Sequence, residues 1–409
     1  YISKDKAGDT MRKKKKIIII ILLLCIFIFL VSFKFVSSRS GFVPKNIFSR
    51  DQIVYRTKEG DLLYGFQTIE NQTYYFNKET GIMQTGFTEI DDNTYYFKED
   101  GTMVKGLYRI EDDFYYFDED GKKIKNQFKK VFMNEKDQIS YFDKEGKMVT
   151  NQYKEKTFNE DGQLLIDKDT LLKQAQAIIN KYGGNVGLYF KDLRTQQEIS
   201  INDNTFYPCS IIKVCVLVTV YNYIDQGLLE YDSCQTYLEN MIIHSDNTSY
   251  NALISMLGNG NGIKGLQVVN TYMMELGLQN TQLHNSLSPG DIYFSDNGSN
   301  ISCPSDIGLL FDLLYQGKII SKAACDQMLN LLKQCSDQRA IWQGLPNTVE
   351  FAHKSGWAYD LYLDGGIVYI PDKDYILVLF TDQISNKTDF FKEMSSLFYT
   401  YETKLFTLE

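Results

Sequence analysis

The chain has 409 residues, of which 43 are Lys or Arg and 52 are Asp or Glu, and its formal net charge is −9. This length accommodates two or three domains with a sizeable core, and the acidity argues against nucleic acid as the main partner. Seven cysteines and three histidines occur without a CxxC or HExxH motif, so we expect no metal and no cofactor.

A basic segment followed by an apolar segment opens the chain. Residues 1–16 end in MRKKKK, and residues 17–33 are almost entirely apolar. This run is at the short end of what spans a bilayer, and the positive charges before it place the N-terminus inside. We therefore expect a basic cytoplasmic tail, a single-pass membrane anchor at 17–33, a polar stalk at 34–54 and an extracytoplasmic body. A cleaved signal peptide is the alternative.

A short repeat occupies residues 55–165, and its clearest copies begin at Gly65, Gly86 and Gly106. Each copy contains a Tyr-Tyr-Phe triplet, which is typical of a strand, and then an acidic turn with a glycine. A fixed period of this length predicts a solenoid of β-hairpins, in which each unit buries one face on the next.

These repeats resemble the cell-wall-binding repeats of Gram-positive surface proteins, of the choline-binding or glucan-binding type. In that family, aromatic side chains of neighbouring hairpins form cages for choline or platforms for sugars. Cation–π attraction and apolar stacking make both ligands physically reasonable. Residues 55–165 contain no tryptophan, which choline-binding members use heavily. We expect a wall glycan or a choline-like ligand here, and a packed spacer is the alternative.

The pattern changes in residues 166–409. An amphipathic helix is predicted, capped near Asp167 or Asp169 and ended by the Gly183-Gly184 pair. A strand pair, a buried helix after Ser210, strands from about 351 to 382 and a last helix at about 388–404 follow. Strands at both ends with helices between them predict an α/β (α+β) domain, an antiparallel sheet flanked by helices.

Three short motifs lie in this region. They are Ser210-x-x-Lys213, Ser245-Asp246-Asn247 and Lys354-Ser355-Gly356. In this order they are the signature of class A β-lactamases and penicillin-binding proteins, and residues 166–409 resemble the class A β-lactamase-like serine hydrolases.

The residue types suit acyl transfer. Ser210 lies at a helix start, where the positive end of the helix favours an oxyanion, and Lys213 lies one turn further on the same side, where it can accept the serine proton. Lys354 would lower the pKa of Lys213 through repulsion of like charges. Ser245 can relay the proton to the leaving nitrogen.

Substrate binding is expected from the second and third motifs. Asn247 can hold the amide side chain of the substrate, and Lys354 with Ser355 can bind a carboxylate on the strand that carries Gly356. By resemblance, the backbone N–H groups of Ser210 and Trp357 form the oxyanion hole, in which such a donor contributes about 3 kcal/mol.

The sequence departs from the family in three places. Residues 276–304 should carry the glutamate that activates the deacylating water, yet they contain only Asp291 and Asp296, and Glu275 just before them is expected to face solvent. Ser210 and Ser245 are unusually close in sequence, so a wall of the cleft is expected to be missing. After Gly356 no Arg or Lys occurs before Lys373, so carboxylate binding is expected to rest on Lys354 and Ser355.

Residues near the motifs are predicted to be structural. Cys209, His244 and His353 adjoin the motifs without a role in them, and the GxGxxG stretch at 260–265 follows a helix rather than a strand, which excludes a dinucleotide site.

The leading functional interpretation is a membrane-anchored, wall-associated serine hydrolase that opens β-lactams through an acyl-enzyme. Two alternatives remain. One is a D,D-peptidase, or a slowly deacylating penicillin-binding protein or sensor, that acts on peptidoglycan stem peptides. The other is a non-catalytic wall-binding surface protein.

Overall fold

The computed structural model describes Lys16 and residues 18–27, 40–46, 49–371 and 373–405. These residues form two compact units. The first runs to Val131 and takes in Tyr141–Val149, and the second takes Phe132–Ser140 and the chain from Thr150 onward.

The predicted membrane anchor, residues 17–33, lies partly outside the described residues, as do the predicted tail before Lys16 and part of the stalk. Of the anchor, residues 18–27 are described, and they are helical. In the part of the chain that the structure covers, no helix has both the length and the apolar character needed to cross a bilayer.

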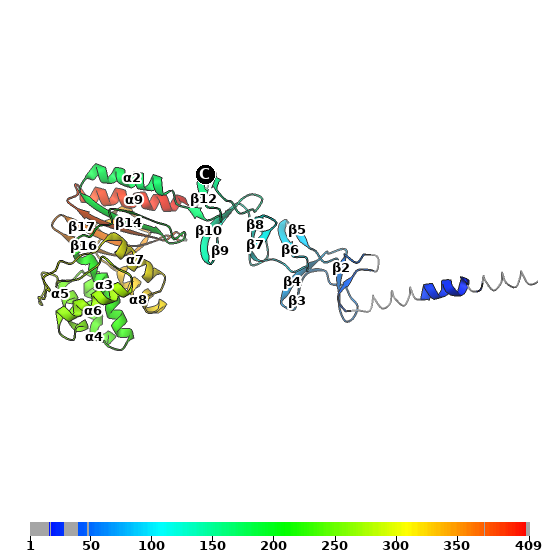
Figure 1. Ribbon diagram of the computed structural model, residues 1–409, viewed down its shortest axis with the longest axis horizontal. Helices are drawn as coiled ribbons and strands as arrows, with labels where there is room; N and C mark the ends of the chain where they lie inside the picture. Colours follow the sequence, from blue (N-terminus) through cyan, green and yellow to red (C-terminus); the bar gives the residue numbers. More distant parts are fainter. Residues whose placement is uncertain (1–15, 17, 28–39, 47–48, 372, 406–409) are drawn as a thin grey trace, which may run out of the picture. The chain divides into compact units, whose positions relative to one another are not determined.

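The repeats form antiparallel hairpins, as predicted (Figure 1). In each clear copy the opening glycine pairs with the phenylalanine of the Tyr-Tyr-Phe triplet, for example Gly86 with Phe97. Asp91 and Asp92, which join these two strands, both have positive φ, the conformation that Asp and Asn tolerate in tight hairpins. The strands of this region are β1 (Gly41–Pro44), β2 (Ile53–Arg56), β3 (Gly65–Ile69), β4 (Gln72–Phe76), β5 (Gly86–Ile90), β6 (Asn93–Phe97), β7 (Gly106–Ile110), β8 (Asp113–Phe117), β9 (Gln127–Met133) and β10 (Lys136–Phe142).

One hydrogen bond recurs from copy to copy and joins successive hairpins. The backbone N–H of Met103 donates to the backbone carbonyl of Thr73, and that of Lys123 donates to the backbone carbonyl of Thr94. Each copy thus satisfies backbone groups of the copy before it, which is the reason for the solenoid.

The second unit is built on a five-stranded antiparallel sheet of order β15-β14-β18-β17-β16. Its strands are β14 (Asn185–Asp192), β15 (Glu198–Ile201), β16 (Glu350–Ala358), β17 (Leu361–Tyr369) and β18 (Tyr375–Asp382). Residues 150–165, which the sequence pattern assigned to the repeats, belong to this unit. They contain the short strands β11 (Gln152–Tyr153), β12 (Lys156–Phe158) and β13 (Leu164–Leu165).

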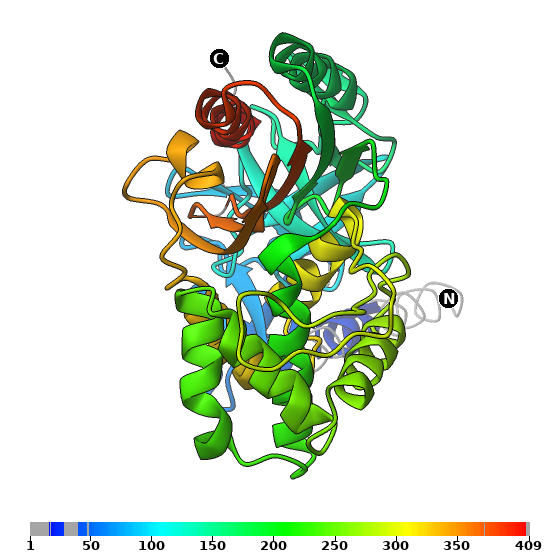
Figure 2. The ribbon, with the colours of Figure 1, turned by 90° about the vertical axis from the view of Figure 1, so that its left-hand side faces the viewer.

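Helices flank this sheet, as predicted. The terminal helices α2 and α9 lie side by side on one face, and the helices between β15 and β16 lie on the other (Figures 1 and 2). Asp167 caps α2 by accepting a hydrogen bond from the Thr170 N–H. The helices are α2 (Lys168–Tyr182), α3 (Lys213–Asp225), α4 (Tyr231–Ile243), α5 (Asn247–Leu257), α6 (Gly262–Glu275), α7 (Pro304–Tyr315), α8 (Lys322–Leu332) and α9 (Lys387–Leu405), with the 3₁₀ turns η1 (Cys209–Ile212) and η2 (Ile341–Gly344).

The GxGxxG stretch serves helix packing rather than phosphate binding. A Cβ on Gly265 would lie 1.8 Å from the carbonyl oxygen of Ile254. Only glycine therefore allows α5 and α6 to cross at this distance, which explains the motif without a ligand.

Candidate active site

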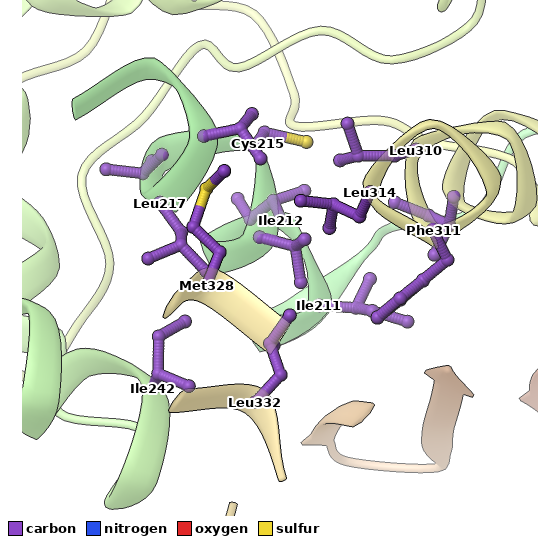
Figure 3. Close-up of a cluster of buried hydrophobic side chains, with 14 of the residues drawn as sticks. Ile211, Ile212, Cys215, Leu217, Ile242, Leu310, Phe311, Leu314, Met328 and Leu332 are labelled. Atoms are coloured by element: carbon purple, nitrogen blue, oxygen red, sulfur yellow. The ribbon is translucent and has the colours of Figure 1, made fainter. Parts of the chain in front are cut away.

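Ser210 is held at the edge of the main core. It lies in η1, where no side chain caps the turn. The next two residues, Ile211 and Ile212, are fully buried in the cluster that contains Leu310 and Phe311 (Figure 3). Burial of such side chains stabilises by about 2 kcal/mol each, and it fixes the backbone that carries the hydroxyl.

Lys213 opens α3 and turns its ammonium group toward the other motifs. Its Nζ lies 2.9 Å from Ser210 Oγ, 2.6 Å from the carbonyl oxygen of Ser245, 3.2 Å from Ser245 Oγ and 2.7 Å from Asn247 Oδ1. The side chain is fully buried. The first two motifs therefore meet at one nitrogen atom.

Burial and, after it, the charge of Lys354 lower the pKa of Lys213 to about 6, against the opposing charges of Asp246 and Cys335. At neutral pH the neutral amine dominates, with two N–H donors and one lone pair. The Ser245 carbonyl and the Asn247 amide oxygen accept the two donors, which leaves the lone pair for the Ser210 hydroxyl. This is the state in which Lys213 can act as a base.

Ser245 and Asn247 are positioned by the start of α5. Asp246 caps this helix by accepting from the Ser249 N–H at 2.6 Å, and Ser245 has a φ of +57°. This left-handed conformation costs a residue with a side chain on the order of 1 kcal/mol, and such strain clusters at functional sites. Asn247 Nδ2 also donates to the carbonyl of Ser288 at 3.1 Å, which ties α5 to the 276–304 loop.

The third motif lies on β16. A Cβ on Gly356 would lie 2.6 Å from the backbone nitrogen of Ser210, so glycine is required for the strand to pass the nucleophile. This approach brings β16 to the backbone N–H of Ser210 that was predicted to form the oxyanion hole with that of Trp357. The Trp357 side chain is exposed.

Lys354 is fully buried, and burial lowers its pKa. Its Nζ donates to the carbonyl of Ser355 at 2.9 Å. Within the described residues it makes no hydrogen bond to Ser210 or Ser245. Lys354 therefore acts on Lys213 through its charge, as predicted, and not through a direct contact.

A cavity of about 530 Å³ opens beside these motifs. Ser245, Lys354, Ser355 and Trp357 line it together with a segment that the sequence analysis overlooked, residues 335–339 between α8 and η2. In this segment Asp337 accepts a hydrogen bond of 2.7 Å from Ser355 Oγ and pairs with Arg339 at 2.8 Å.

Carboxylate binding was expected to rest on Lys354 and Ser355, and a further cation lies at the same cavity: the guanidinium of Arg339 lines it, 5.5 Å from the centre of the Trp357 ring. Arg339 precedes Gly356 in the chain, whereas the expectation considered only cations after that glycine. The polar stretch CSDQRA at 335–340, between α8 and η2, was the available signal.

Neither aspartate of the 276–304 loop forms a hydrogen bond or an ion pair with Ser210, Lys213 or Ser245 in the structure. Asp296 is paired with His284 at 2.9 Å, and both Asp291 and Glu275 are exposed. Among the described residues, Lys213 has no carboxylate in ion-pair contact. The short sequence separation between Ser210 and Ser245 corresponds to a single helix, α4, between α3 and α5.

The repeats contain paired aromatic rings from successive hairpins. The centroids of Phe66 and Tyr95 are 5.1 Å apart, and those of Phe87 and Tyr115 are 5.2 Å apart. The second pair holds a cation of the protein itself, since Lys123 Nζ lies 4.8 Å from the Phe87 centroid and 5.4 Å from that of Tyr115.

Lys123 occupies a position that holds methionine in the preceding copy. The backbone of Phe117 forms an isolated antiparallel β-bridge with Lys123, just as that of Phe97 does with Met103. Burial lowers the pKa of Lys123, as expected for an ammonium that rests between rings.

Known proteins share both parts of this architecture. Residues 170–237 and 233–401 match the beta-lactamase enzyme family, and because this match extends over more than half of the 409 residues, the chain belongs to that family. It is a serine hydrolase of the β-lactamase superfamily. Residues 63–105, 84–128 and 104–153 match the choline-binding repeat. No curated protein matches the chain.

Solved structures agree on the fold. PBP-A is 24% identical, with a TM-score of 0.51 over 57% of this chain and 96% of its own. A mutant of PBP-A, as an acyl-enzyme complex with penicillin G, is 23% identical, with a TM-score of 0.52 over 59% and 98%. A β-lactamase from Sphaerobacter thermophilus is 19% identical, with a TM-score of 0.50 over 60% and 99%. Identities this low show the fold alone.

Acylation of Ser210 by a penicillin should follow the deprotonation of Lys213. We expect the rate to rise between pH 5 and pH 7, through the pKa of about 6, and to level off above it, since only the neutral amine accepts a proton. Lys213→Met should lower the rate about 100- to 10,000-fold, the range for loss of a general base. Adduct formation followed by intact mass at each pH measures both, with the exposed Lys264→Met as control. A flat profile in wild type would contradict the assignment.

Arg339 should bind the carboxylate of a β-lactam. Loss of a charge-assisted hydrogen bond costs roughly 1.5–3 kcal/mol, so Arg339→Ala should slow acylation by a penicillin about 10- to 100-fold. The methyl ester of the same penicillin, which lacks the charge, should be almost unaffected. Equal losses for acid and ester would show that Arg339 acts on the fold and not on the carboxylate.

Proposed function

We propose that this chain forms an acyl-enzyme on Ser210 from β-lactams and from the peptide stems of peptidoglycan, and that it releases the acyl group slowly. The observation that carries the proposal is the fully buried Lys213 amine, 2.9 Å from Ser210 Oγ and with its pKa lowered to about 6.

In the proposed reaction, Ser210 Oγ attacks the carbonyl carbon of the amide and its proton passes to the lone pair of Lys213. The backbone N–H groups of Ser210 and Trp357 stabilise the oxyanion. The C–N bond then breaks, an ester to Ser210 remains, and Ser245 passes the proton from Lys213 to the leaving nitrogen. The 3.2 Å between Lys213 Nζ and Ser245 Oγ suits this relay.

The residues proposed to contact the substrate lie at and beside the cavity. Lys354 and Arg339 supply positive charge to a carboxylate, and Ser355 can exchange its hydrogen bond with Asp337 for one with the substrate. Asn247 keeps its amide group between Lys213 and the carbonyl of Ser288. A substrate amide therefore has to compete for this group or bind beside it.

Deacylation distinguishes the two enzymatic interpretations. Fast β-lactam hydrolysis requires a base that activates water at the ester, and the described 276–304 loop places no carboxylate there. A slowly deacylating penicillin-binding protein or D,D-peptidase therefore fits this site better than a fast β-lactamase.

The full chain should show a burst with a chromogenic cephalosporin, in which one equivalent reacts and steady turnover is slow, because acylation is catalysed and deacylation lacks its base. Intact mass should give one adduct per chain. Ser210→Ala should give none, and the exposed Ser233→Ala should behave as wild type.

Sustained turnover of several cephalosporins per second would overturn slow release and restore the β-lactamase interpretation. An absence of adduct on wild type would remove the enzymatic interpretation altogether, and would leave the wall-binding surface protein.

We further propose that the repeats bind the cell wall through their aromatic pairs, and that residues 17–33 anchor the chain in the membrane with the hydrolase domain outside. The first part rests on the ring geometry, and the second on the apolar run and the basic residues before it. Resistance of the full chain to alkaline carbonate extraction from membranes tests the anchor.

Lys123 should compete with a cationic wall ligand at its own ring pair. Lys123→Met removes the internal cation and gives this pair the residue found in the preceding copy, so choline should bind to one more site per chain, with cation–π attraction of roughly 0.5–2 kcal/mol. Titration calorimetry with choline on the full chain measures the stoichiometry, and Lys105→Met, an exposed lysine of the same region, is the matched control. An unchanged stoichiometry would argue against a cationic ligand at this pair and leave a sugar as the candidate.

A further inference from the structure

Cys335 is a second nucleophilic group that lines the candidate active-site cavity. It follows α8, and its thiol is free. The residue faces the cavity beside Ser245 and Lys354, although it is only 6% exposed. The proposed acyl transfer makes no use of it.

A histidine and an aspartate lie behind this thiol. His353 Nδ1 is 2.8 Å from Asp364 Oδ1 on the neighbouring strand. The imidazole is stacked on the Phe351 ring with centroids 4.3 Å apart, and its side chain is 1% exposed. Its other nitrogen, Nε2, has no hydrogen-bond partner in the part of the chain that the structure describes. One nitrogen of this buried imidazole is thus fixed by a carboxylate, and the other is left without a hydrogen bond.

The Cys335 thiol lies near this imidazole, and each of the two side chains shifts the pKa of the other. Burial raises the pKa of Cys335, but interaction with the His353 imidazole and with the Lys354 charge outweighs burial and brings it to about 7. Asp364 in turn raises the pKa of His353 to about 10 against the effect of burial. Near neutral pH a large share of Cys335 is therefore thiolate beside an imidazolium, the arrangement that activates cysteine nucleophiles.

The other buried cysteines have raised thiol pKa values. Burial raises the pKa of Cys209 to about 12 and that of Cys303 to about 11, and it also raises the pKa of Cys215, Cys234 and Cys325. Chemical selectivity for Cys335 over these five thiols follows, since the thiolate is the reactive form.

We propose that Cys335, with His353 and Asp364, is a modification site for small electrophiles that enter the active-site cavity, hydroperoxides in particular. The thiolate sulfur attacks the terminal oxygen of the hydroperoxide, an S–O bond forms and the O–O bond breaks. Sulfur is oxidised by two electrons to a sulfenic acid, the peroxide is reduced, and the departing alkoxide or hydroxide takes the proton of the His353 imidazolium. The near-complete burial of the thiol limits the site to small reagents.

Modification also acts on the serine site, and this part rests on the proposed function. The Cys335 thiolate is one of the anions that favour the charged form of Lys354, and a sulfenic acid removes that charge and adds an oxygen atom at the wall of the cavity. Acylation of Ser210 should therefore fall as Cys335 is oxidised, and a thiol reductant should restore it.

The test treats the full chain with hydrogen peroxide, traps sulfenic acid with dimedone and maps the adduct by peptide mass spectrometry. Cys335 should be labelled about ten-fold or more faster than each of the other buried cysteines, in line with its thiolate fraction. His353→Gln should slow this labelling while the circular dichroism spectrum stays that of wild type. Cys325→Ala, at a fully buried cysteine of α8, is the matched control and should label at Cys335 as wild type does.

Penicillin acylation is measured on the same samples. It should fall with peroxide in wild type and in Cys325→Ala, and not in Cys335→Ala. Equal labelling of all cysteines, or full labelling of Cys335 in a folded His353→Gln, would overturn the modification site. Equal loss of acylation in Cys335→Ala would overturn its link to Ser210. A chain that takes up dimedone at Cys335 but is never acylated would refute the proposed function and leave the modification site standing.

Discussion

The chemistry of this protein depends on keeping one lysine amine out of water. Lys213 is completely buried, and a charged ammonium is costly in that environment, so its proton is held weakly. The cost is limited because two oxygens accept the remaining N–H groups, one from the backbone of Ser245 and one from the side chain of Asn247. The same contacts that make burial possible aim the lone pair at Ser210. Base strength and geometry thus come from a single packing arrangement.

The surrounding structure keeps this arrangement rigid. Ile211 and Ile212 fasten the nucleophile to the core, and Gly356 lets β16 pass against its backbone. Ser245 is held in a left-handed conformation that few residues adopt freely. Such a site is assembled by folding and needs little reorganisation when substrate arrives, which is the condition for electrostatic stabilisation of an oxyanion.

The protein combines this site with features that restrain it. The loop over α5 supplies backbone carbonyls and amides but no carboxylate at the ester, while Asp337 already occupies part of the polar wall that a substrate carboxylate would use. In the repeats, Lys123 similarly occupies a ring pair in place of an external cation. Both parts of the chain thus carry internal groups at the positions where ligands are proposed to bind.

The repeats, the antiparallel sheet flanked by helices and the three motifs could be predicted from the sequence, because they depend on local periodicity, capping and residue spacing. Asp167 at the start of α2 and the Tyr-Tyr-Phe strands are examples. Three further arrangements become visible in the folded chain. Asp337 and Arg339 share the cavity, Lys123 rests between two rings, and Cys335 lies near the His353–Asp364 pair. The first and third of these contacts join segments whose spacing follows no period, and they arise from how β16, β17 and the end of α8 pack, which no local pattern encodes. The Lys123 contact lies at a repeat position, and its ring neighbours come together only when successive hairpins stack.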